Sequence, residues 1–294
     1  MTNEKKALIA LIITVVLWAS AFVGIRYVME AFSAGGLALS RYFVASLAAF
    51  IPFCLIKNKK LPRLKDLMLF AVLGFFGFFS YNILLNEGEK TVSAGLANFI
   101  VAQLPIIVTV LAMILFKERV NRYGVLGFVI SLCGVLVILL GSHNNAGFAG
   151  VLLVYGATCS GAIYSCFQKK FLARYHPIEV VCYCMWLGTL MLMIFAPEAI
   201  KSVMHSDMSH LLSIVYMGVF PGAIAYLLWG YAFKHIKAAA ASSALYLMPI
   251  FTLILAAIFL SEIPSILSVI GGIIAVIGSI VISKFGVAVT RKDQ

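Results

Sequence analysis

The sequence predicts an all-α integral membrane protein in which ten transmembrane helices form two inverted five-helix repeats around a central cavity. Three observations lead to this prediction: the composition, the spacing of apolar segments and an internal repeat. Of the 294 residues, 63% are hydrophobic and 11% are charged, whereas a soluble domain is about half apolar and about a quarter charged. A water-soluble fold could not cover so much apolar surface with so few charges. The composition therefore excludes a cytosolic enzyme, a nucleic-acid-binding module, a disordered chain and a secreted disulfide scaffold.

Apolar segments of about 20 residues, the length that crosses a bilayer core, follow one another along the chain. Short charged breaks, or breaks that contain Gly, Pro or Asn, separate them. We expect the first five helices at 7–29, 34–56, 67–85, 92–116 and 123–141, and the second five at 148–168, 178–196, 211–233, 238–260 and 264–283. The most polar central segment, 141–147, is the predicted linker. The two predicted domains are therefore the five-helix repeats 7–141 and 148–284.

Lysine and arginine are divided unevenly between the two predicted sides of the membrane. With a cytoplasmic N-terminus, the cytoplasmic segments hold 18 of the 22 Lys and Arg residues, and the other side holds 4. The 11 acidic residues divide 5 and 6. A bias confined to basic residues is typical of the positive-inside rule. We therefore expect both termini in the cytoplasm and the protein in a bacterial inner membrane, and the net charge of +11 needs no nucleic-acid partner.

The internal repeat appears when the sequence is shifted by 144 residues. Between 67 and 138 this shift matches about 17 of roughly 70 positions, about twice what chance would give for so apolar a chain. The matched pairs include Gly74 with Gly218, Pro105 with Pro249, Glu118 with Glu262, Gly127 with Gly271 and Gly134 with Gly278. Because the unit has five helices, the second copy enters the membrane upside down. Inverted repeats place a site near the mid-bilayer and permit alternating access, although an old duplication kept only for packing is the alternative.

Two segments resemble a known signature. The stretches from Pro105 to Glu118 and from Pro249 to Glu262 are each followed by a Gly-rich helix, Trp18-Ala-Ser-Ala-Phe lies in the first helix, and Arg41 lies early in the second. Together they are similar to the drug/metabolite transporter superfamily, EamA type, over nearly the whole chain. The second unit departs from the pattern at its start, where 160–164 lacks the tryptophan. The resemblance implies a cavity lined by helices 1, 3, 4, 6, 8 and 9, and transport of small metabolites, often export of amino acids.

Polar and aromatic side chains deep in the predicted helices indicate a binding site. Asn98 and Pro105 lie on one stripe of the fourth helix, and the corresponding positions of the ninth hold Ser242, Tyr246 and Pro249. A mid-helix proline frees a backbone carbonyl, so this stripe can form the wall of a polar pocket. The alternative is that the prolines only shape packing and that the Asn and Ser bond neighbouring helices.

Helices 3 and 8 add a second mirrored pair, Asn82 and Tyr226, with Trp229 three residues after Tyr226. Tyr155 and Tyr216 lie nearer to helix ends, where we expect ordinary interfacial or packing residues. Aromatic walls with neutral hydrogen-bonding groups suit a small amphipathic solute, such as a neutral or aromatic amino acid. The predicted substrate-binding residues are Trp18, Asn82, Asn98, Tyr164, Tyr226, Trp229, Ser242 and Tyr246.

Charged residues within or near apolar segments are candidates for coupling or gating, because burying a charge in a membrane is costly. Arg26 and Glu30 are spaced to pair along the first helix. Arg41 is expected to snorkel or to be structurally paired, with a gating pair to Glu30 or Glu87 as the alternative. Glu87 is the preferred proton-coupling candidate because its repeat position is Tyr231, although a solvated carboxylate at the outer rim fits the same position.

The remaining candidates are structural or hinge residues. Glu118 and Glu262 lie at helix ends and are expected to stabilise the adjacent turns. Pro105 and Pro249 are expected to bend their helices. Gly218 and Gly222 have the spacing that lets helices pack closely in lipid, with a sliding or hinging surface as a second interpretation.

These features predict a secondary transporter that moves a small amphipathic metabolite by alternating access, with export as the expected direction. Export of cationic drugs, or of heterocyclic metabolites such as nucleobases or vitamins, is the first alternative, and an integral-membrane enzyme is the second. An enzyme is disfavoured because the sequence has no HExxH motif and no nucleophile elbow. The chain also has no P-loop, which excludes direct ATP coupling within it. We expect no catalytic residue, no metal and no cofactor. The expected partners are the small-molecule substrate and membrane lipid, and the chain is a monomer or a homodimer.

Overall fold

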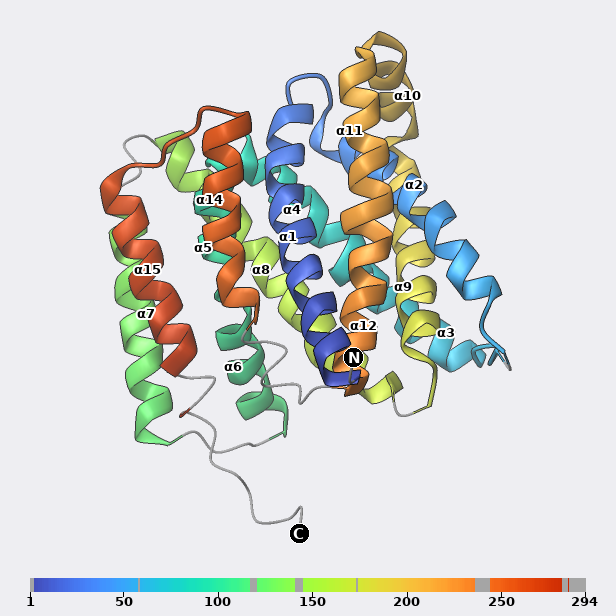
Figure 1. Cartoon of the computed structure of the whole chain (residues 1–294), viewed down its shortest axis with the longest axis horizontal. Helices are drawn as coiled ribbons and strands as arrows, with labels where there is room; N and C mark the ends of the chain where they lie inside the picture. Colours follow the sequence, from blue (N-terminus) through green and yellow to red (C-terminus); the bar gives the residue numbers. More distant parts are fainter. Residues whose placement is uncertain are drawn as a thin grey trace.

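A computed structural model describes residues 3–57, 59–116, 121–140, 145–172, 174–235, 244–281 and 285. Its regular elements are all helical (Figure 1). Within the described residues, six helices are long and apolar enough to cross a membrane, and four shorter apolar helices complete a set of ten. The predicted all-α fold is therefore confirmed.

The first repeat contains five helical rods. They are α1 (Asn3–Val28), α2 (Ala34–Cys54), a third rod made of α3 (Leu64–Gly74), the π-helical η1 (Phe75–Ser80) and α4 (Tyr81–Glu89), a fourth made of α5 (Ala94–Val101) and α6 (Leu104–Phe116), and α7 (Arg122–Leu140). The third rod continues to Glu89, four residues beyond the predicted end of its span.

The second repeat follows the same plan. Its rods are α8 (Asn145–Leu172), then α9 (Pro177–Leu192), η2 (Met193–Phe195) and α10 (Ala196–His205), then α11 (Met208–Val219), the π-helical η3 (Phe220–Ile224) and α12 (Ala225–His235), then η4 (Ala244–Leu247) and α14 (Met248–Phe259), and finally α15 (Ile266–Val281).

Both repeat-related prolines lie in the first turn of a helix that follows a break. Pro105 is the second residue of α6, after α5 has ended at Val101, and Pro249 is the second residue of α14, after the 3₁₀ turn η4. Proline has no N–H and fits the first helical turn, where that donor would lack a partner. Each proline therefore divides its rod into two helices rather than bending one helix.

The two repeats run in opposite directions. Arg26, at the end of α1, donates to the backbone carbonyl of Glu89 at the end of α4, so these two ends share a face. At the other end of the same third rod, Asp66 near the start of α3 accepts from Arg174 and Tyr175, which follow α8. The first helices of the two repeats, α1 and α8, thus end on opposite faces of the bundle.

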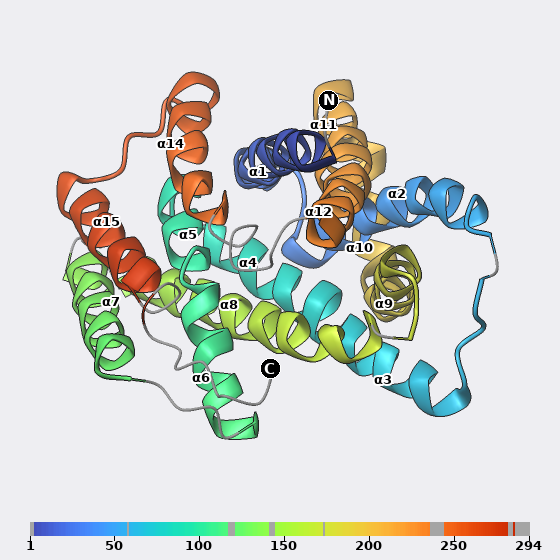
Figure 2. The same cartoon turned by 60° about the horizontal axis from the view of Figure 1, so that its bottom comes forward.

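The packing of the second repeat mirrors that of the first. Helix α1 packs on α12 and α14, and its mate α8 packs on α4 and α6. Helices α2 and α11 pack together, as do their mates α9 and α3. Figures 1 and 2 both show α7 beside α15 at one edge of the bundle, with α2, α3, α9 and α11 at the other.

Glycines at repeat-related positions make matching close contacts. A Cβ at Gly134 would lie 2.4 Å from the Ala275 nitrogen, and one at Gly278 would lie 2.4 Å from the Ser131 nitrogen. Ala275 and Ser131 are themselves 144 residues apart. The two π-helical segments also fall at matching positions, so the repeat visible in the sequence is reproduced in the backbone geometry.

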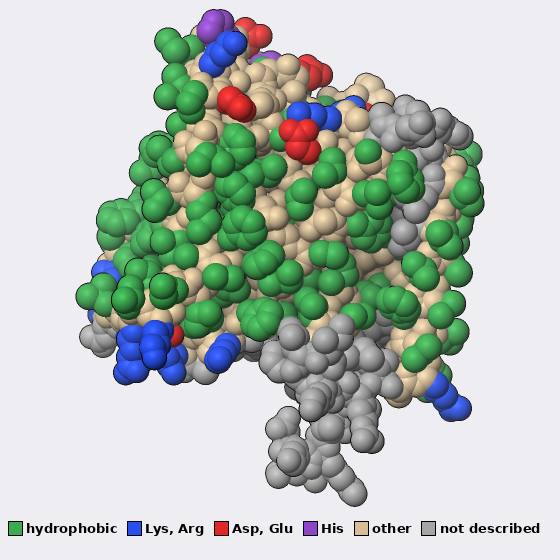
Figure 3. Space-filling view, turned by 180° about the vertical axis from the view of Figure 1, so that it is seen from behind, with side chains coloured by type: hydrophobic (Ala, Val, Ile, Leu, Met, Phe, Trp, Pro, Cys, Tyr) green, Lys and Arg blue, Asp and Glu red, His purple; other side chains and the backbone are tan. Residues whose placement is uncertain are grey.

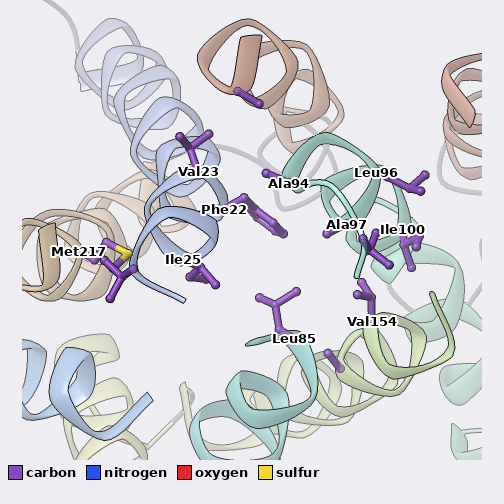
Figure 4. Close-up of a cluster of buried hydrophobic side chains, with 14 of the residues drawn as sticks. Phe22, Val23, Ile25, Leu85, Ala94, Leu96, Ala97, Ile100, Val154 and Met217 are labelled. Carbon is purple, nitrogen blue, oxygen red and sulfur yellow. The ribbon is translucent and has the colours of Figure 1, made fainter. Parts of the chain in front are cut away.

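Apolar side chains fill the interior and also cover the outside. Figure 4 shows Phe22, Leu85, Ile100 and Val154 pointing toward one another from four different rods, and each is at most 4% exposed. On the outer face, Ile51, Leu190, Ile258 and many other large apolar residues stay exposed. Figure 3 shows this apolar belt across the middle of one face, with basic residues gathered at the lower edge and acidic and histidine side chains at the upper end. This is the surface of a membrane protein.

Candidate functional site

Trp18 of α1 lies against two aromatic side chains of α12. Its ring centroid is 5.3 Å from that of Tyr226 and 5.2 Å from that of Trp229. The Trp18 indole Nε1 donates to the Pro221 carbonyl at 3.2 Å. Pro221 belongs to the π-helical turn η3, in which the Ala225 N–H bonds to the Phe220 carbonyl rather than to Pro221. The irregular turn therefore offers a backbone acceptor that orients Trp18.

Phe78 in η1 extends this contact to the remaining rods. Its ring lies 5.9 Å from Tyr226, 5.5 Å from Tyr164 of α8 and 5.3 Å from Tyr42 of α2. We refer to this group as the aromatic cluster, which comprises Trp18, Tyr42, Phe78, Tyr164, Tyr226 and Trp229. It joins side chains from both repeats at the middle of the bundle. Four of its members were expected from the sequence, whereas Tyr42 and Phe78 were not.

A glycine allows the cluster to close. A Cβ at Gly77 would lie 2.7 Å from ring atoms of Tyr164, so only glycine permits that ring to approach η1. Phe78 and Tyr164 are buried, while Trp18, Tyr226 and Trp229 are half-buried. The three half-buried rings therefore keep part of their surface available for contact.

Polar atoms without partners lie beside the cluster. The Asn82 amide nitrogen donates to the Phe78 carbonyl at 2.8 Å, but its Oδ1 is buried without a hydrogen-bond partner among the described residues. The buried Tyr164 hydroxyl is in the same condition. An unpaired buried polar group costs about 1–3 kcal/mol, so both atoms are suited to a polar ligand.

Asn98 of α5 forms a second connection between the two repeats, next to the aromatic cluster. Its Nδ2 donates to Thr252 Oγ1 of α14 at 2.5 Å, and Thr252 in turn donates to the Ala19 carbonyl at 3.3 Å, next to Trp18. The Asn98 Oδ1 is buried and lacks a partner in the described part of the chain. Thr252 carried no signal in the sequence, because its repeat position is Val108. Ser242 and Glu118, the other members of these mirrored pairs, lie outside the described residues.

Two tyrosines lie differently from what their sequence positions suggested. The Tyr246 hydroxyl donates to the Ser279 carbonyl of α15 at 3.1 Å, which directs this group toward the outer helix pair. Tyr155 was expected to be an ordinary interfacial residue, but its hydroxyl donates to Gln103 Oε1 at 2.8 Å, between α5 and α6. Gln103 also accepts from Ser131 of α7 at 3.3 Å, so it forms a buried polar link among three rods.

The expected Arg26–Glu30 pair is wrong. Arg26 instead pairs with Glu262, with Nε and Oε1 2.7 Å apart, and donates to the backbone carbonyls of Glu89 and Lys90. Glu30 is exposed. Glu30 lies after the last residue of α1, and the partner of Arg26 comes from the loop after α14.

Glu262 also does more than support its own turn. Its second oxygen accepts from the Ala94 N–H at the start of α5, at 3.2 Å. The ion pair therefore ties the end of α14 to the ends of α1 and α4 and to the beginning of α5, and it crosses from one repeat to the other.

Glu87 occupies the rim of this face. It pairs with Lys90 at 2.7 Å, and both side chains are about 40% exposed. This position agrees with the second interpretation of Glu87, a solvated carboxylate at the rim. Neither Glu87 nor Glu30 forms an ion pair with Arg41 among the described residues.

Glu89, two residues further along, is the buried carboxylate that the sequence analysis missed. It is 0% exposed, and both of its carboxyl oxygens lack hydrogen-bond partners within the described residues. Asn82, Asn86 and Glu89 lie at i, i+4 and i+7, one buried stripe of α4. Extending the helix beyond Leu85 would have placed Glu89 on that stripe and Glu87 off it.

Arg41 is buried beside the aromatic cluster. It is 6% exposed, its guanidinium lies 5.2 Å from the ring centroid of Tyr42, and its Nε lacks a partner among the described groups. Glu89 and the phenols of Tyr81 and Tyr226 all lie within electrostatic range of Arg41. Gly218 packs against the Arg41 carbonyl and Val44, and Gly222 packs against Ala45, so both glycines serve close helix packing.

The opposite face carries a separate polar network. Tyr175 donates to Asp66 at 2.7 Å, and Lys60 Nζ donates to the Arg174 carbonyl at 3.0 Å. Burial, and then the hydrogen bond to the Asp66 carboxylate, raise the pKa of the Tyr175 phenol. The Lys60 N–H also donates to Glu179, which forms a capping box with His176 at the start of α9. This network fixes the α2–α3 connection to the second repeat.

The comparisons with known proteins decide the family. Residues 5–140 and 148–284 each match the EamA-like transporter family. The chain belongs to this family. It is thus a multi-pass integral membrane transporter and not an enzyme, and the described residues contain no group of three or more His, Cys, Asp or Glu that could hold a metal ion.

Several curated proteins are similar over most of the chain. An uncharacterized transporter, YdfC, of Bacillus subtilis is 38% identical over 256 residues, 87% of this chain and 83% of its own. A probable terminal-alkyne amino-acid exporter of Streptantibioticus cattleyicolor is 34% identical, over 91% of this chain and 90% of its own. A probable amino-acid metabolite efflux pump of Salmonella typhimurium is 25% identical, over 88% of each chain. One crystal structure, 18% identical, matches with a TM-score of 0.63 over 95% of this chain and 97% of its own, which supports the fold.

Proposed function

We propose that this EamA transporter exports a small amphipathic amino acid, neutral or aromatic, by alternating access. The observation that carries the proposal is the aromatic cluster, in which Trp18 and Phe78 of one repeat meet Tyr164, Tyr226 and Trp229 of the other. A ligand held at such a junction contacts both halves, so it is sensitive to their relative movement. The names of two relatives, an amino-acid exporter and an amino-acid metabolite efflux pump, favour the same substrate class.

The polar atoms beside the cluster favour a solute with hydrogen-bonding groups. The Asn82 and Asn98 side-chain oxygens and the Tyr164 hydroxyl are buried without partners among the described residues. A ligand that satisfies them removes the cost of their burial. Aromatic walls supply the affinity for an apolar side chain. Trp229 and Ser242 complete the proposed substrate contacts, whereas the Tyr246 hydroxyl is bonded to the Ser279 carbonyl.

The buried Arg41 disfavours the alternative of a cationic drug, because a cation in the cluster would be repelled by the nearby guanidinium. Heterocyclic metabolites such as nucleobases stay a second candidate, since stacking on Trp18 and Tyr226 does not require a charge. The competing classes differ in their charges, and a transport assay can separate them.

We also propose the orientation. The connection between α2 and α3 holds Lys57, Lys59, Lys60 and Arg63, at the face where α1 begins and α15 ends. Basic loops remain in the cytoplasm. This face is therefore the cytoplasmic side of a bacterial inner membrane, and the Arg26–Glu262 ion pair lies on the outer side.

The test is counterflow in proteoliposomes loaded with unlabelled aromatic or neutral amino acids, with labelled solute outside. Saturable uptake that exceeds that of protein-free vesicles, and that Tyr226→Ala reduces while Tyr216→Phe does not, is the expected result. Tyr216 is a suitable control because it is partly exposed, its hydroxyl bonds to Ser20, and its ring stacks on Phe220 outside the aromatic cluster. The absence of exchange across amino acids, nucleobases and vitamins would refute the proposal.

A further inference from the structure

We propose that Arg41 and Glu89 recognise the two charges of a zwitterionic α-amino acid, and that a proton competes with the substrate ammonium for Glu89. This inference rests on the proposed amino-acid transport. It concerns two residues of the same repeat, and their repeat positions, Met185 and Phe233, carry no charge. The duplication therefore does not explain this pair, and the second repeat has no equivalent of it.

Burial without partners is the first step of the argument. Both oxygens of Glu89 and the Nε of Arg41 are buried and lack hydrogen bonds among the described residues. Desolvating a carboxylate or a guanidinium costs several kcal/mol unless a partner of opposite charge compensates. The two groups form no direct ion pair within the described chain, yet they lie within electrostatic range of each other. Each thus retains the capacity to bind one further charge.

Two guanidinium groups act on Glu89; Arg26 has the stronger influence, and Arg41 is the one that forms no ion pair among the described residues. From α1, Arg26 faces it, but Arg26 is bonded to Glu262 and to two backbone carbonyls. Glu262, from the loop after α14, adds a negative charge. From its own helix, Tyr81 approaches without a charge. Helix α8 reaches the last turn of α4 through Gly150 and Val154, and α5 presents no titratable side chain between Ala94 and Val101.

The position of Arg41 and Glu89 relative to the aromatic cluster indicates which class of ligand fits the site. Arg41 lies over the ring of Tyr42, a member of the cluster, and within electrostatic range of Tyr226. A carboxylate on Arg41 and an ammonium on Glu89 would leave the side chain of an amino acid to contact the aromatic rings. Arginine binds carboxylates through several donors, which suits it to this end of the ligand. The chemistry matches an α-amino acid with an apolar or aromatic side chain.

This arrangement also gives the direction of coupling. A proton on a Glu89 oxygen removes the negative charge that holds the ammonium, so proton and substrate exclude each other at Glu89. When the site faces outward, a proton from the outer water binds Glu89 as the amino acid leaves. When the site faces inward, that proton passes to the inner water as the next amino acid binds. One proton entering for each substrate leaving is antiport, which drives export under an inward proton gradient.

The experiment compares three ligands of the same shape. Phenylalanine carries both charges, 2-phenylethylamine lacks the carboxylate, and 3-phenylpropionate lacks the ammonium. Binding to the purified full-length protein is measured by calorimetry for the wild type, Arg41→Gln, Glu89→Gln and the matched control Glu87→Gln. The control lies two residues away and pairs with Lys90 at the exposed rim.

We expect the wild type and Glu87→Gln to prefer phenylalanine over either analogue by about tenfold or more. Arg41→Gln should lose the preference over 2-phenylethylamine, and Glu89→Gln should lose the preference over 3-phenylpropionate. In vesicles, an inward proton gradient should accelerate phenylalanine export by the wild type and Glu87→Gln but not by Glu89→Gln. Glu89→Asp should restore part of the response.

A measurement on the wild type keeps the inference testable if a variant does not fold. Lowering the pH should weaken binding of phenylalanine but not that of 3-phenylpropionate, because only the ammonium competes with the proton. Equal pH dependence for the two ligands would overturn the inference, as would unchanged discrimination in both variants. If either result is found while the wild type still exchanges phenylalanine, the inference about Arg41 and Glu89 fails and the proposed function stands. If no amino acid is exchanged, the proposed function itself fails.

Discussion

Arg26 and Glu262 are 236 residues apart in sequence, and their side chains meet at 2.7 Å on the face opposite the basic loops. The contact joins the end of the first helix of one repeat to the end of the fourth rod of the other. Glu262 also accepts a hydrogen bond from the Ala94 N–H, so a single carboxylate connects three chain segments. An alternating-access transporter must separate its repeats at one face at a time, and this ion pair opposes separation at the face where it lies.

Breaking the Arg26–Glu262 pair should weaken the contact between the two repeats at this face. We expect a coupling energy on the order of 1 kcal/mol in a double-mutant cycle of Arg26→Gln and Glu262→Gln, because both side chains are partly exposed. The measurement is thermal unfolding in detergent. Glu30→Gln serves as the control, since Glu30 is only one turn from Arg26 but exposed. A loss as large for Glu30→Gln as for Glu262→Gln would contradict the observed pairing.

Removing aromatic surface from the cluster should weaken substrate binding. Tyr226 contacts both Trp18 and Phe78, so Tyr226→Ala should lower affinity by about tenfold, while Tyr226→Phe keeps the ring and most of the binding. Ligand-induced shifts in melting temperature report the affinity. A loss of binding in Tyr226→Phe as severe as in Tyr226→Ala would show that the hydroxyl, not the ring, contacts the solute.

A methyl group at the α7–α15 crossing should be costly. A Cβ at Gly134 would lie 2.4 Å from the Ala275 nitrogen and 2.6 Å from the Gly271 carbonyl oxygen, both backbone atoms. Gly134→Ala should therefore destabilise the protein by about 1–3 kcal/mol, although alanine is the better helix former by about 1 kcal/mol. Gly230→Ala is the matched control, because its nearest neighbour, Pro177, would be 3.6 Å away. Denaturation in detergent should show a lower free energy of unfolding for Gly134→Ala and a higher one for Gly230→Ala.

The Asn98–Thr252 hydrogen bond should couple the two repeats within the membrane. Thr252→Val removes the hydroxyl that accepts from Asn98 and donates to Ala19, at nearly constant volume. We expect a loss of about 1–2 kcal/mol in thermal stability, as for a buried hydrogen bond whose partner is left unpaired. Thr189→Val provides a comparison at another buried threonine that bonds to Met185 and Tyr42. A neutral Thr252→Val variant would indicate that water replaces the hydroxyl.

Much of the aromatic cluster could be predicted from the sequence. Trp18 lies too deep in its helix to anchor at an interface, Tyr164 shares a helix stripe with polar residues, and Tyr226, followed by Trp229, is the repeat mate of Asn82. Phe78 could not be singled out among 22 phenylalanines. Its role depends on which rods meet at η1, and helix periodicity does not report contacts between rods. Tyr42 was missed for the same reason.

The buried carboxylate illustrates a different limit. Hydropathy ended the third span at Leu85, so Glu89 fell outside the predicted helix and was given no role, while Glu87 was the coupling candidate. The helix continues through Glu89, whose side chain is buried, while the side chain of Glu87 reaches water. A helix places residues two apart on different faces, but only the packing decides which face is buried.

The sequence by itself determined the membrane environment, the five-helix repeat with its inversion, and the family to which the chain belongs. These follow from composition, segment length and a 144-residue offset, all of which are properties of the chain read in order. The tertiary structure alone decided the partner of Arg26, the burial of Glu89 and the meeting of Phe78 with Tyr164 and Tyr226. Those contacts form between rods distant in sequence, and their geometry depends on crossing angles and π-helical turns that no local pattern specifies.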